Sequence, residues 1–428
     1  VNDFEEAQTD AFTLKFEQDV SDNTMFINTA RYAKTKQEML LTSPFNYSTT
    51  ANTVTRSMHA KWQENEIFTN QSNFTTEIQT GMLLHKISTG IELTKENQLT
   101  KNYTAQTAQA SNLYNPTSIS WDDLSLSGQK SDGETTTVGA YLFDSINIGE
   151  KVIFTGGGRF DKYDTTNDVV SSTLVPSTIE DKGHLNSYKA GLVYKPVDNG
   201  SVYISRATTQ LPPGGANFTL SATTTNANNP DMEPQKSTTD EIGTKWDLLN
   251  NRLSLTTAIY KTVVENETMT EADGTTSQNG EKEVKGIEFG IVGDITDKWS
   301  MSAGLAKMDT EYTNSTSTNE GLSLRFSPEH TATLWSTYKF TPAINAGAGA
   351  RYVGSQNAKG SITSTVPDID SYIVYDAMAS YKFNKNLTYQ LNVYNLTDEE
   401  YVSNVNNSGR RYTPGASRSG LLSLAYKF

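Results

Sequence analysis

The sequence predicts an all-β fold, an antiparallel transmembrane β-barrel, and three observations support this prediction. Apolar and polar residues alternate with a period of two in segment after segment, as in strands with one apolar and one polar face. Short turns and long polar connectors follow one another in turn, which is the pattern of the two rims of a bacterial outer-membrane barrel. Aromatic residues gather beside the short turns, where amphipathic rings lie at the lipid headgroup level.

Composition limits the class of protein. Hydrophobic residues are 35% of the 428 residues, mean hydropathy is −0.54, and no run approaches about 18 consecutive apolar residues, which excludes a membrane-spanning helix. A β-barrel needs no such run, because its strands alternate. There is no cysteine and the four histidines are scattered, so we expect no metal site and no cofactor. The net charge of −14 argues against nucleic acid as a partner.

Period-two runs predict about seventeen strands. In LTYQLNVYN, for example, Leu387, Tyr389 and Leu391 lie on one face while Thr388 and Gln390 lie on the other. The predicted strands cover residues 8–19, 24–35, 64–79, 82–99, 135–148, 150–164, 186–196, 200–209, 236–248, 252–266, 279–294, 298–312, 329–340, 343–355, 370–383, 386–398 and 418–428.

The same alternation assigns side chains to the two faces. The residues expected to face the lumen are Trp335, Lys339, Arg351, Asp376, Lys382, Gln390, Asn392 and Tyr394. A Lys or Arg on the lipid face at mid-depth would cost about 2–4 kcal/mol, so charged residues are expected inward. A membrane girdle is expected from aromatic residues beside the short turns, namely Trp246, Trp299, Phe340, Phe383, Tyr426 and Phe428.

Connector length argues against the alternatives of a soluble β-sandwich or a solenoid. Short turns such as 19–24, 196–201 and 383–386 alternate with long connectors rich in Asn, Thr, Ser and Gly. The long connectors are expected near 35–63, 100–135, 164–184, 208–235, 266–279, 311–328, 355–370 and 402–418. A sandwich has no reason to place every long loop on one rim.

The last strand and the strand count carry further information. In the final segment GLLSLAYKF, Leu422, Leu424, Tyr426 and Phe428 fall on one side. This resembles the terminal signature of outer-membrane proteins, and the resemblance implies recognition by the barrel-insertion machinery.

Single-chain bacterial barrels have an even number of strands, and here the first connector is a short turn. We therefore expect at least one strand before residue 1.

Longer segments carry a family resemblance over essentially the whole chain. They include NQSNFTTEIQTGMLLHKISTGIEL (70–93), GGGRFDKYD (156–164), EVKGIEFGIVGDITDKWSMSAGLA (283–306), RFSPEHTATLWSTYKF (325–340) and NVYNLTDEEYV. In these segments the chain resembles TonB-dependent outer-membrane siderophore receptors. LPPGGANFTLS (211–221) and the loop GRRYTPGASR place it nearest the catecholate iron-siderophore receptors.

The resemblance implies a barrel of about 22 strands whose lumen is plugged by a separate domain. No segment of this sequence resembles that plug, and no TonB box is visible. We therefore expect residues 1–428 to be the C-terminal part of the barrel, with the plug and first strands before residue 1.

The resemblance also implies a function and partners. A ferric siderophore lands on the extracellular loops, and TonB with its inner-membrane ExbB and ExbD motor drives import across the bacterial outer membrane. Other implied partners are outer-membrane lipid and lipopolysaccharide, and the protein is expected to be a monomer. Iron arrives already chelated, as cargo, so no enzyme chemistry is expected. The glycines of TGGGRF lie within a strand and do not form a phosphate-binding loop.

A ferric tris-catecholate is anionic and aromatic-rimmed, so Arg and aromatic loop residues are the candidates for binding it. These candidates are Arg410, Arg411, Tyr412, Tyr103, Tyr114, Trp121, Arg325 and Phe326. Each can equally pair with lipopolysaccharide, acidic residues or a neighbouring loop.

Two alternatives stay open at this point. A passive porin of about 16–18 strands would fit the strand count, although eight long connectors do not suit it. A TonB-dependent receptor for another cargo, such as cobalamin or a glycan, would share every feature of the barrel. Haem is less attractive as cargo because no loop carries a histidine motif.

Overall fold

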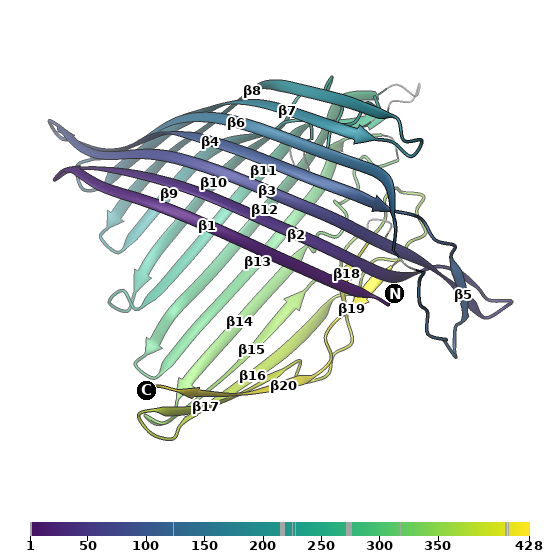
Figure 1. Cartoon of the computed structure of the whole chain (residues 1–428). Helices are drawn as coiled ribbons and strands as arrows, with labels where there is room; N and C mark the ends of the chain where they lie inside the picture. Colours follow the sequence, from purple (N-terminus) through teal and green to yellow (C-terminus); the bar gives the residue numbers. More distant parts are fainter. Residues whose placement is uncertain are drawn as a thin grey trace. The chain divides into compact units, whose positions relative to one another are not determined.

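The computed structural model describes residues 2–428 except 123, 215–218, 225, 227, 271–275, 317, 407, 408 and 410. Every regular element in the described part of the chain is a β-strand (Figure 1). The strands are β1 (Phe4–Ser21), β2 (Thr24–Ser48), β3 (Thr53–Thr80), β4 (Leu83–Tyr103), β5 (Gln109–Asn112), β6 (Leu126–Ile148), β7 (Val152–Val170), β8 (Pro176–Val197), β9 (Gly200–Leu211), β10 (Gln235–Leu248), β11 (Leu253–Thr270), β12 (Thr276–Thr296), β13 (Trp299–Asn314), β14 (His330–Lys339), β15 (Ile344–Val353), β16 (Tyr372–Lys382), β17 (Leu387–Tyr394), β18 (Val402–Val405), β19 (Tyr412–Pro414) and β20 (Ser419–Tyr426).

All seventeen predicted strands are confirmed, as β1–β4, β6–β17 and β20. The structure adds the short β5, which pairs with β3, and a separate pair formed by β18 and β19. No helix in the described ranges is long and apolar enough to cross a membrane. The chain divides into two compact units. Unit 1 comprises residues 1–146, 156–188 and 209–236, and unit 2 comprises residues 147–155, 189–208 and 237–428.

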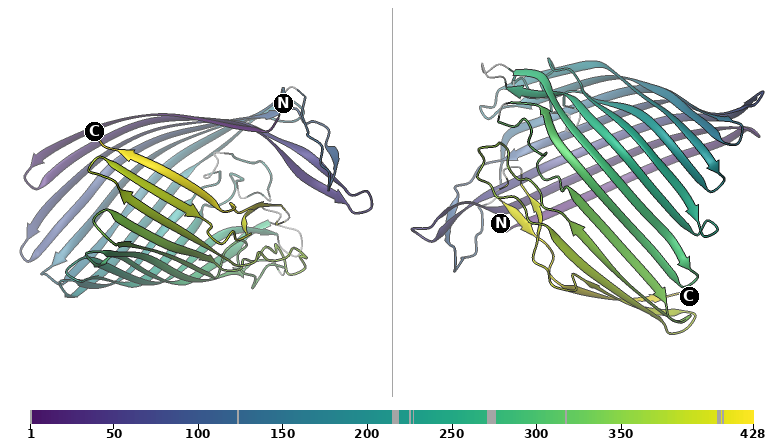
Figure 2. Two further views of the ribbon diagram at one scale, coloured as in Figure 1. Left: turned by 90° about the horizontal axis from the view of Figure 1, so that it is seen from below. Right: turned by 180° about the vertical axis from the view of Figure 1, so that it is seen from behind.

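In unit 1, consecutive strands pair as antiparallel hairpins. β1 pairs with β2 from Phe4↔Leu40 to Ser21↔Thr24, and β2 pairs with β3 over its full length. The expected long connector 35–63 is wrong, because β2 and β3 stay paired as far as Ser48↔Thr53. The hairpin extends beyond its neighbours in both views of Figure 2. Most of its residues are polar and do not alternate regularly with apolar ones, but several are Thr, which suits a pleated strand as well as a loop.

Other connectors are also shorter than expected. Between β7 and β8 the strands end at Val170 and begin again at Pro176, so most of 164–184 is strand. The segment 100–135 contains the end of β4, all of β5 and the start of β6, and the segment 402–418 contains the β18–β19 pair. Polar strand extensions look like loops in a sequence because neither of their faces is apolar.

In unit 2, the register places residues of alternate positions on two distinct faces. Trp335 lies opposite Gly349, and Arg351 lies opposite Thr333 and Val374. Gln390 lies opposite Ser380 and Ser423. We call this side the polar face. The other side, the apolar face, carries the cross-strand pairs Leu391↔Leu422 and Tyr389↔Leu424.

The polar face needs glycine where its largest side chain lies against the sheet. A Cβ added at Gly349 would lie 2.4 Å from Cε3 of Trp335, and one added at Gly347 would lie 3.2 Å from Trp335 Cζ2. The glycines of AINAGAGARYV therefore make room for the Trp335 ring on the backbone of β15.

Burial is the reverse of that in a water-soluble protein. Among the described residues, the only buried hydrophobic residues are Leu40, Trp121, Tyr163, Leu220, Leu253, Ala358, Ile369 and Val374. Large apolar side chains are instead exposed along the apolar face, for example Ile204 (57%), Ile259 (55%) and Leu422 (65%). Such continuous apolar exposure requires an apolar environment, which lipid supplies.

Candidate functional site

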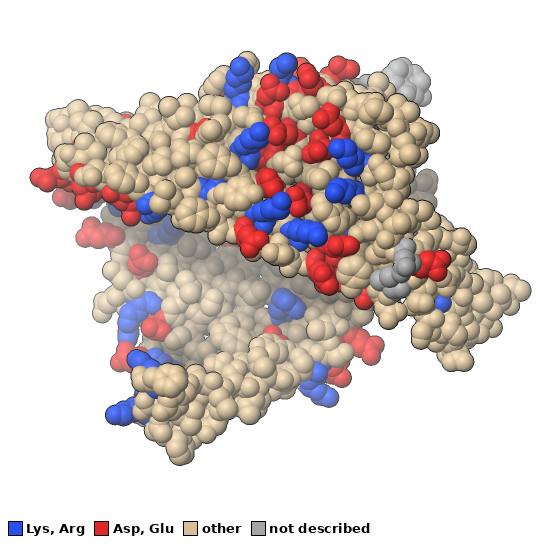
Figure 3. All heavy atoms as spheres, in the orientation of Figure 1, with Lys and Arg blue, Asp and Glu red and all other residues tan. Residues whose placement is uncertain are grey.

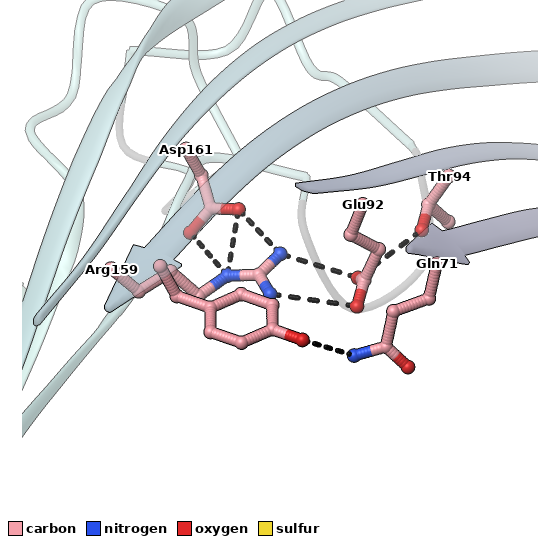
Figure 4. A network of polar contacts seen from close by, with 6 residues as sticks. Gln71, Glu92, Thr94, Arg159 and Asp161 are labelled. Carbon is pink, nitrogen blue, oxygen red and sulfur yellow. Dashed lines mark hydrogen bonds and ion pairs between the residues drawn. The ribbon is translucent and has the colours of Figure 1, made fainter. Parts of the chain in front are cut away.

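In unit 1, one face of the sheet carries a network of charged and polar side chains (Figure 4). Gln71 and Glu92 lie opposite each other on this face, and we call it the polar face of unit 1. Arg159 of β7 lies at its centre. Its guanidinium contacts Asp161 on the same strand, with Nη2 to Oδ1 at 2.6 Å, and Glu92 of β4, with Nη2 to Oε1 at 3.2 Å. The three side chains are largely buried, with exposed fractions of 12% for Asp161, 25% for Arg159 and 28% for Glu92. The network therefore links β4 to β7 across β6, which lies between them in the sheet.

Amide and hydroxyl groups extend this network. Gln71 Nε2 donates to the Tyr141 hydroxyl at 3.1 Å, and that hydroxyl donates to Asn73 Oδ1 at 3.0 Å. Gly90 makes room for the Tyr141 ring, because a Cβ there would lie 2.6 Å from its hydroxyl oxygen. This face offers donors and acceptors at fixed positions, as a surface that holds a polar partner must.

The sequence prediction missed Arg159, Glu92 and Asp161. A signal was present in GGGRFDKYD, where Arg159, Asp161 and Tyr163 alternate and so share one face. Tyr163 donates to Asp181 of β8 at 3.0 Å and so extends the row to that strand. The partner Glu92 lies far along the chain, and only the strand register reveals that it meets Arg159.

In unit 2, three loops meet around Arg325. The Arg325 Nε donates to the Ala358 carbonyl at 3.2 Å, and the guanidinium carbon lies 4.7 Å from the Phe326 ring centroid. Phe326 has a φ of 60°, an unusual value for a bulky residue, and its N–H donates to the Asn357 carbonyl. A Cβ added at Gly409 would lie 3.5 Å from Arg325 Nη2, so the loop that leads to Tyr412 lies against the guanidinium.

The Arg325 guanidinium is open to an anion. Among the described residues, no carboxylate lies within ion-pair distance of it, and its two terminal nitrogens make no hydrogen bond. A half-buried guanidinium with two free nitrogens and an aromatic ring beside it suits a planar, anionic, aromatic group. Two sequence candidates that are adjacent in the chain, Arg325 and Phe326, thus lie with the guanidinium over the ring.

A cavity of about 580 Å³ lies beside these loops. Its walls include the stacked rings of Tyr372 and Tyr401, whose centroids are 4.3 Å apart, and the exposed Tyr412. Arg351 donates to the Tyr401 hydroxyl at 3.4 Å. Asp368, Asp370, Asp398, Glu399 and Glu400 also line it, so its charge does not favour an anion.

The remaining ligand candidates differ in accessibility. Arg410 lies outside the described residues. Arg411 is half-buried, and its N–H donates to Asn406 Oδ1 at 3.0 Å. Tyr114 is 80% exposed. The Tyr103 hydroxyl is held by Glu38 Oε1 at 2.5 Å, and burial together with this hydrogen bond raises the pKa of Tyr103.

The structure corrects the prediction that Trp121 is a ligand candidate. Its ring is only 2% exposed, and its indole N–H donates to Thr42 Oγ1 at 2.9 Å. The ring is therefore not open to a ligand, and it anchors the 104–125 loop to the β2–β3 hairpin.

The residues expected in the lumen share the polar face by register. Asp376 accepts from the Asn395 N–H at 2.8 Å, and Gln390 donates to Asn392 at 3.1 Å. Lys339, Lys382 and Tyr394 are exposed, and Trp335 is half-buried over its glycines.

The residues expected in the girdle lie beside the short turns. Trp246 packs on Gly200, Trp299 donates to Ser336 Oγ, and the others are more than half exposed: Phe340, Phe383, Tyr426 and Phe428. No group of three or more His, Asp or Glu side chains in the described part of the chain is arranged to hold a metal ion.

Comparison with known proteins identifies similar chains. The family model "TonB dependent receptor-like, beta-barrel" matches residues 2–396. The sequence is 38% identical over 462 residues to the catecholate siderophore receptor Fiu of Escherichia coli K12, covering all of this chain and 61% of Fiu. It is 33% identical to the probable TonB-dependent siderophore receptor PiuA of Acinetobacter baumannii, again covering 61% of the relative.

Solved structures agree with these sequence matches. The crystal structure of the ferric-catecholate import receptor Fiu from E. coli K12, in its closed form, superposes with a TM-score of 0.94, covering 100% of this chain and 65% of that one. The crystal structure of PiuA from A. baumannii superposes with a TM-score of 0.90 at 32% identity, with the same coverage. The chain thus spans about three-fifths of the length of the curated relatives it matches.

Proposed function

The chain belongs to the TonB-dependent receptor β-barrel family, and from this premise we propose that the full-length protein imports a ferric siderophore of the catecholate class. Its place is the bacterial outer membrane, as the family and the exposed apolar face require. The cargo binds at the extracellular loops and is carried inward by transport coupled to TonB and the ExbB–ExbD motor.

One observation carries the proposal. The chain is similar over its entire length to a receptor whose substrate class is known, with 38% identity and a TM-score of 0.94 to Fiu. PiuA, a second siderophore receptor, matches over the same span. The similarity covers the loops as well as the strands, and in such receptors the loops bind the cargo.

The chemistry of the Arg325 cluster supports an anionic, aromatic cargo. Three catecholates around Fe³⁺ leave a net negative charge and a rim of flat rings. The free terminal nitrogens of Arg325 can donate to catecholate oxygens, and Phe326 offers a flat apolar face. Arg411 and the exposed Tyr412 follow Gly409, which lies against Arg325, so they are the next residues along this surface.

The polar face supports the part of the proposal that concerns coupling of transport to TonB. We assign it to the lumen, with Trp335, Lys339, Arg351, Asp376, Gln390 and Tyr394 on the wall of unit 2 and the Arg159 network on the wall of unit 1. A plug domain outside this chain would contact these side chains and move when TonB pulls on it. The protein itself supplies no covalent chemistry, because the iron remains chelated throughout.

The test is equilibrium binding to the full-length protein, refolded in detergent and followed by tryptophan fluorescence. Ferric tris-catecholates should bind with submicromolar affinity, and ferric hydroxamates and cobalamin should bind much more weakly. Arg325→Ala should weaken catecholate binding about tenfold or more, because hydrogen bonds to a charged partner contribute about 1.5–3 kcal/mol.

Arg252→Ala is the matched control. Arg252 is exposed in a short turn, where it pairs with Asp297, and its loss should leave binding unchanged. Equal affinity in wild type and Arg325→Ala would remove Arg325 from the site. Absence of binding to every ferric catecholate would refute the substrate class, and tight binding of cobalamin or a glycan instead would assign another cargo.

A further inference from the structure

The cavity lined by Tyr372, Tyr401 and Tyr412, which we call the acidic cavity, has the size and the aromatic walls of a small-molecule site. Its volume is about 580 Å³, within the usual range of about 300–1,000 Å³ for such sites. The rings of Tyr372 and Tyr401 are stacked, with 4.3 Å between centroids and 27° between planes, and the exposed Tyr412 adds a third ring. All three residues belong to unit 2. The Arg325 cluster does not account for this second site.

Carboxylates set the charge of the acidic cavity. Five of them line it: Asp368, Asp370, Asp398, Glu399 and Glu400. Asp368 pairs with Lys359 at 3.3 Å, and Asp398 accepts from the Arg418 N–H at 2.7 Å. Among the described residues, the other three carboxylates form no ion pair and accept no hydrogen bond, and no lysine or arginine lines the cavity. The cavity therefore carries uncompensated negative charge.

Unit 1 shows that unpaired carboxylates are not a general property of this acidic chain. On the face seen in Figure 3, acidic and basic side chains lie interleaved in a band across the strands of unit 1. In the same unit, Lys34 contacts both Glu64 and Glu66, at 2.7 Å and 2.8 Å. Three free carboxylates around one cavity are thus a local feature, and the net charge of −14 does not explain them.

The walls of the acidic cavity are held by buried contacts. Asn395 is only 3% exposed, and its side-chain oxygen accepts from the Glu399 N–H at 2.8 Å. Its amide nitrogen donates to the carbonyls of Glu399 and Ala416, at 2.9 Å and 3.0 Å. Tyr401 lies against Gly415, where an added Cβ would overlap its ring. The segments on the two sides of the β18–β19 pair are therefore tied together, and the cavity is formed before a ligand arrives.

An organic cation fits this combination of charge and rings, because an ammonium group is attracted both to carboxylates and to the faces of aromatic rings. No group of three acidic or histidine side chains in the described ranges is arranged to hold a metal ion, so a bare divalent cation is a poorer match. The position of the cavity indicates what carries the cation. Gly409 lines the cavity, and a Cβ added to it would lie 3.5 Å from Arg325 Nη2. One glycine thus separates the acidic cavity from the open guanidinium.

We propose that the acidic cavity binds an ammonium group carried by the siderophore, so that the preferred cargo is a ferric catecholate with a cationic arm. Arg325 then donates to a catecholate, while the ammonium group donates to the free carboxylates and lies against the Tyr372 ring. A purely anionic complex places negative charge beside these carboxylates, which disfavours it. This assignment rests on the proposed siderophore import and narrows its substrate class.

The experiment compares three ferric catecholates that differ only at the end of one arm, which carries a primary ammonium group, its N-acetyl derivative or a carboxylate. Binding to the full-length receptor in detergent is followed by tryptophan fluorescence. The ammonium complex should bind at least about tenfold more tightly than the acetylated one, and the carboxylate complex should bind most weakly. The triple variant Asp370→Asn/Glu399→Gln/Glu400→Gln should abolish this ranking and leave the affinity for the acetylated complex unchanged.

Further variants make the result specific to the cavity. Tyr372→Leu should lower the preference for the ammonium complex about threefold, and Tyr372→Phe should keep it, because the ring alone supplies the attraction. Glu320→Gln removes an exposed carboxylate from the connector between β13 and β14, outside the cavity, and should leave the preference unchanged. Arg325→Ala should weaken all three complexes alike, because it acts on the catecholate that they share.

A probe without iron separates the cation site from the siderophore. Phenethylammonium should bind the wild-type receptor in isothermal titration calorimetry and should not bind the triple variant. This result, together with failure of every ferric catecholate to bind, would refute siderophore import and support a cation site in the cavity. Equal affinity of the ammonium and acetylated complexes for the wild type, or a preference that persists in the triple variant, would overturn the proposal.

Discussion

A charge placed on the apolar face of β17 tests the assignment of the two faces. Leu391 is 46% exposed and lies between Ala379 of β16 and Leu422 of β20. It is the fifth residue after Asn386 in the short turn, which gives about 16 Å along the strand and about 12 Å in height. Leu391 therefore lies near the middle of an apolar band about 25 Å tall.

Leu391→Arg should destabilise the folded barrel in lipid by about 2–4 kcal/mol, the cost of an arginine at the bilayer midplane. That is a factor of about 30–700 in the folding equilibrium constant. The neighbouring substitution Gln390→Arg puts the same charge on the polar face, opposite Ser380 and Ser423, and should cost less than about 1 kcal/mol.

The assay is reversible unfolding of the full-length receptor in lipid vesicles by guanidinium chloride, followed by tryptophan fluorescence. A large loss for Leu391→Arg with a small one for Gln390→Arg supports the assignment. Equal losses, or a larger loss for Gln390→Arg, would refute it, because the apolar face would then not contact lipid.

Three further predictions concern unfolding. Arg159→Ala should lower the free energy of unfolding by about 2–4 kcal/mol, because it leaves the largely buried carboxylates of Asp161 and Glu92 without their cation. Adding Asp161→Asn should recover part of this loss. A loss under about 0.5 kcal/mol would show that the network does not stabilise the fold. Gly349→Ala should displace the Trp335 ring, lower the free energy of unfolding by about 1–3 kcal/mol and shift the tryptophan emission. Gly304→Ala is the control and should cost less, because its added Cβ would lie 3.2 Å from Thr333 Oγ1. Equal effects of the two substitutions would contradict the close approach of the Trp335 ring to Gly349. The raised pKa of Tyr103 means that the folded state holds this proton more tightly than the unfolded state, so its contribution to stability is complete below about pH 10 and is lost as the pH rises further. Tyr103→Phe should therefore flatten the fall in the unfolding midpoint above about pH 10, and identical pH profiles for the two proteins would contradict this.

Strands with one lipid-facing side could be predicted because lipid enforces a strict period of two. The segment 387–394 shows this alternation without interruption, and the structure places β17 at those residues. Hairpin ends beyond the membrane have no such constraint. Residues 36–63 mix apolar and polar side chains on both faces, as the adjacent Leu40 and Leu41 show, so their pairing in β2 and β3 was not visible in the sequence.

The candidate site was predictable only in part. Arg325 and Phe326 are adjacent, and they were candidates because their residue types suit the anionic, aromatic cargo that the family resemblance implies. The partners that set their geometry, Ala358 and Gly409, come from loops far along the chain. Trp121 shows the opposite limit, because an aromatic residue in a polar loop can be buried against a hairpin that the sequence does not reveal.

The most direct test of the central claim is uptake of radioactive iron, supplied as a ferric tris-catecholate, by cells that lack their own receptors and express the full-length protein. The account predicts saturable uptake that requires both this protein and a functional TonB, and that falls in the Arg325→Ala variant. Uptake that persists without TonB and rises linearly with concentration would contradict it and would indicate a passive pore.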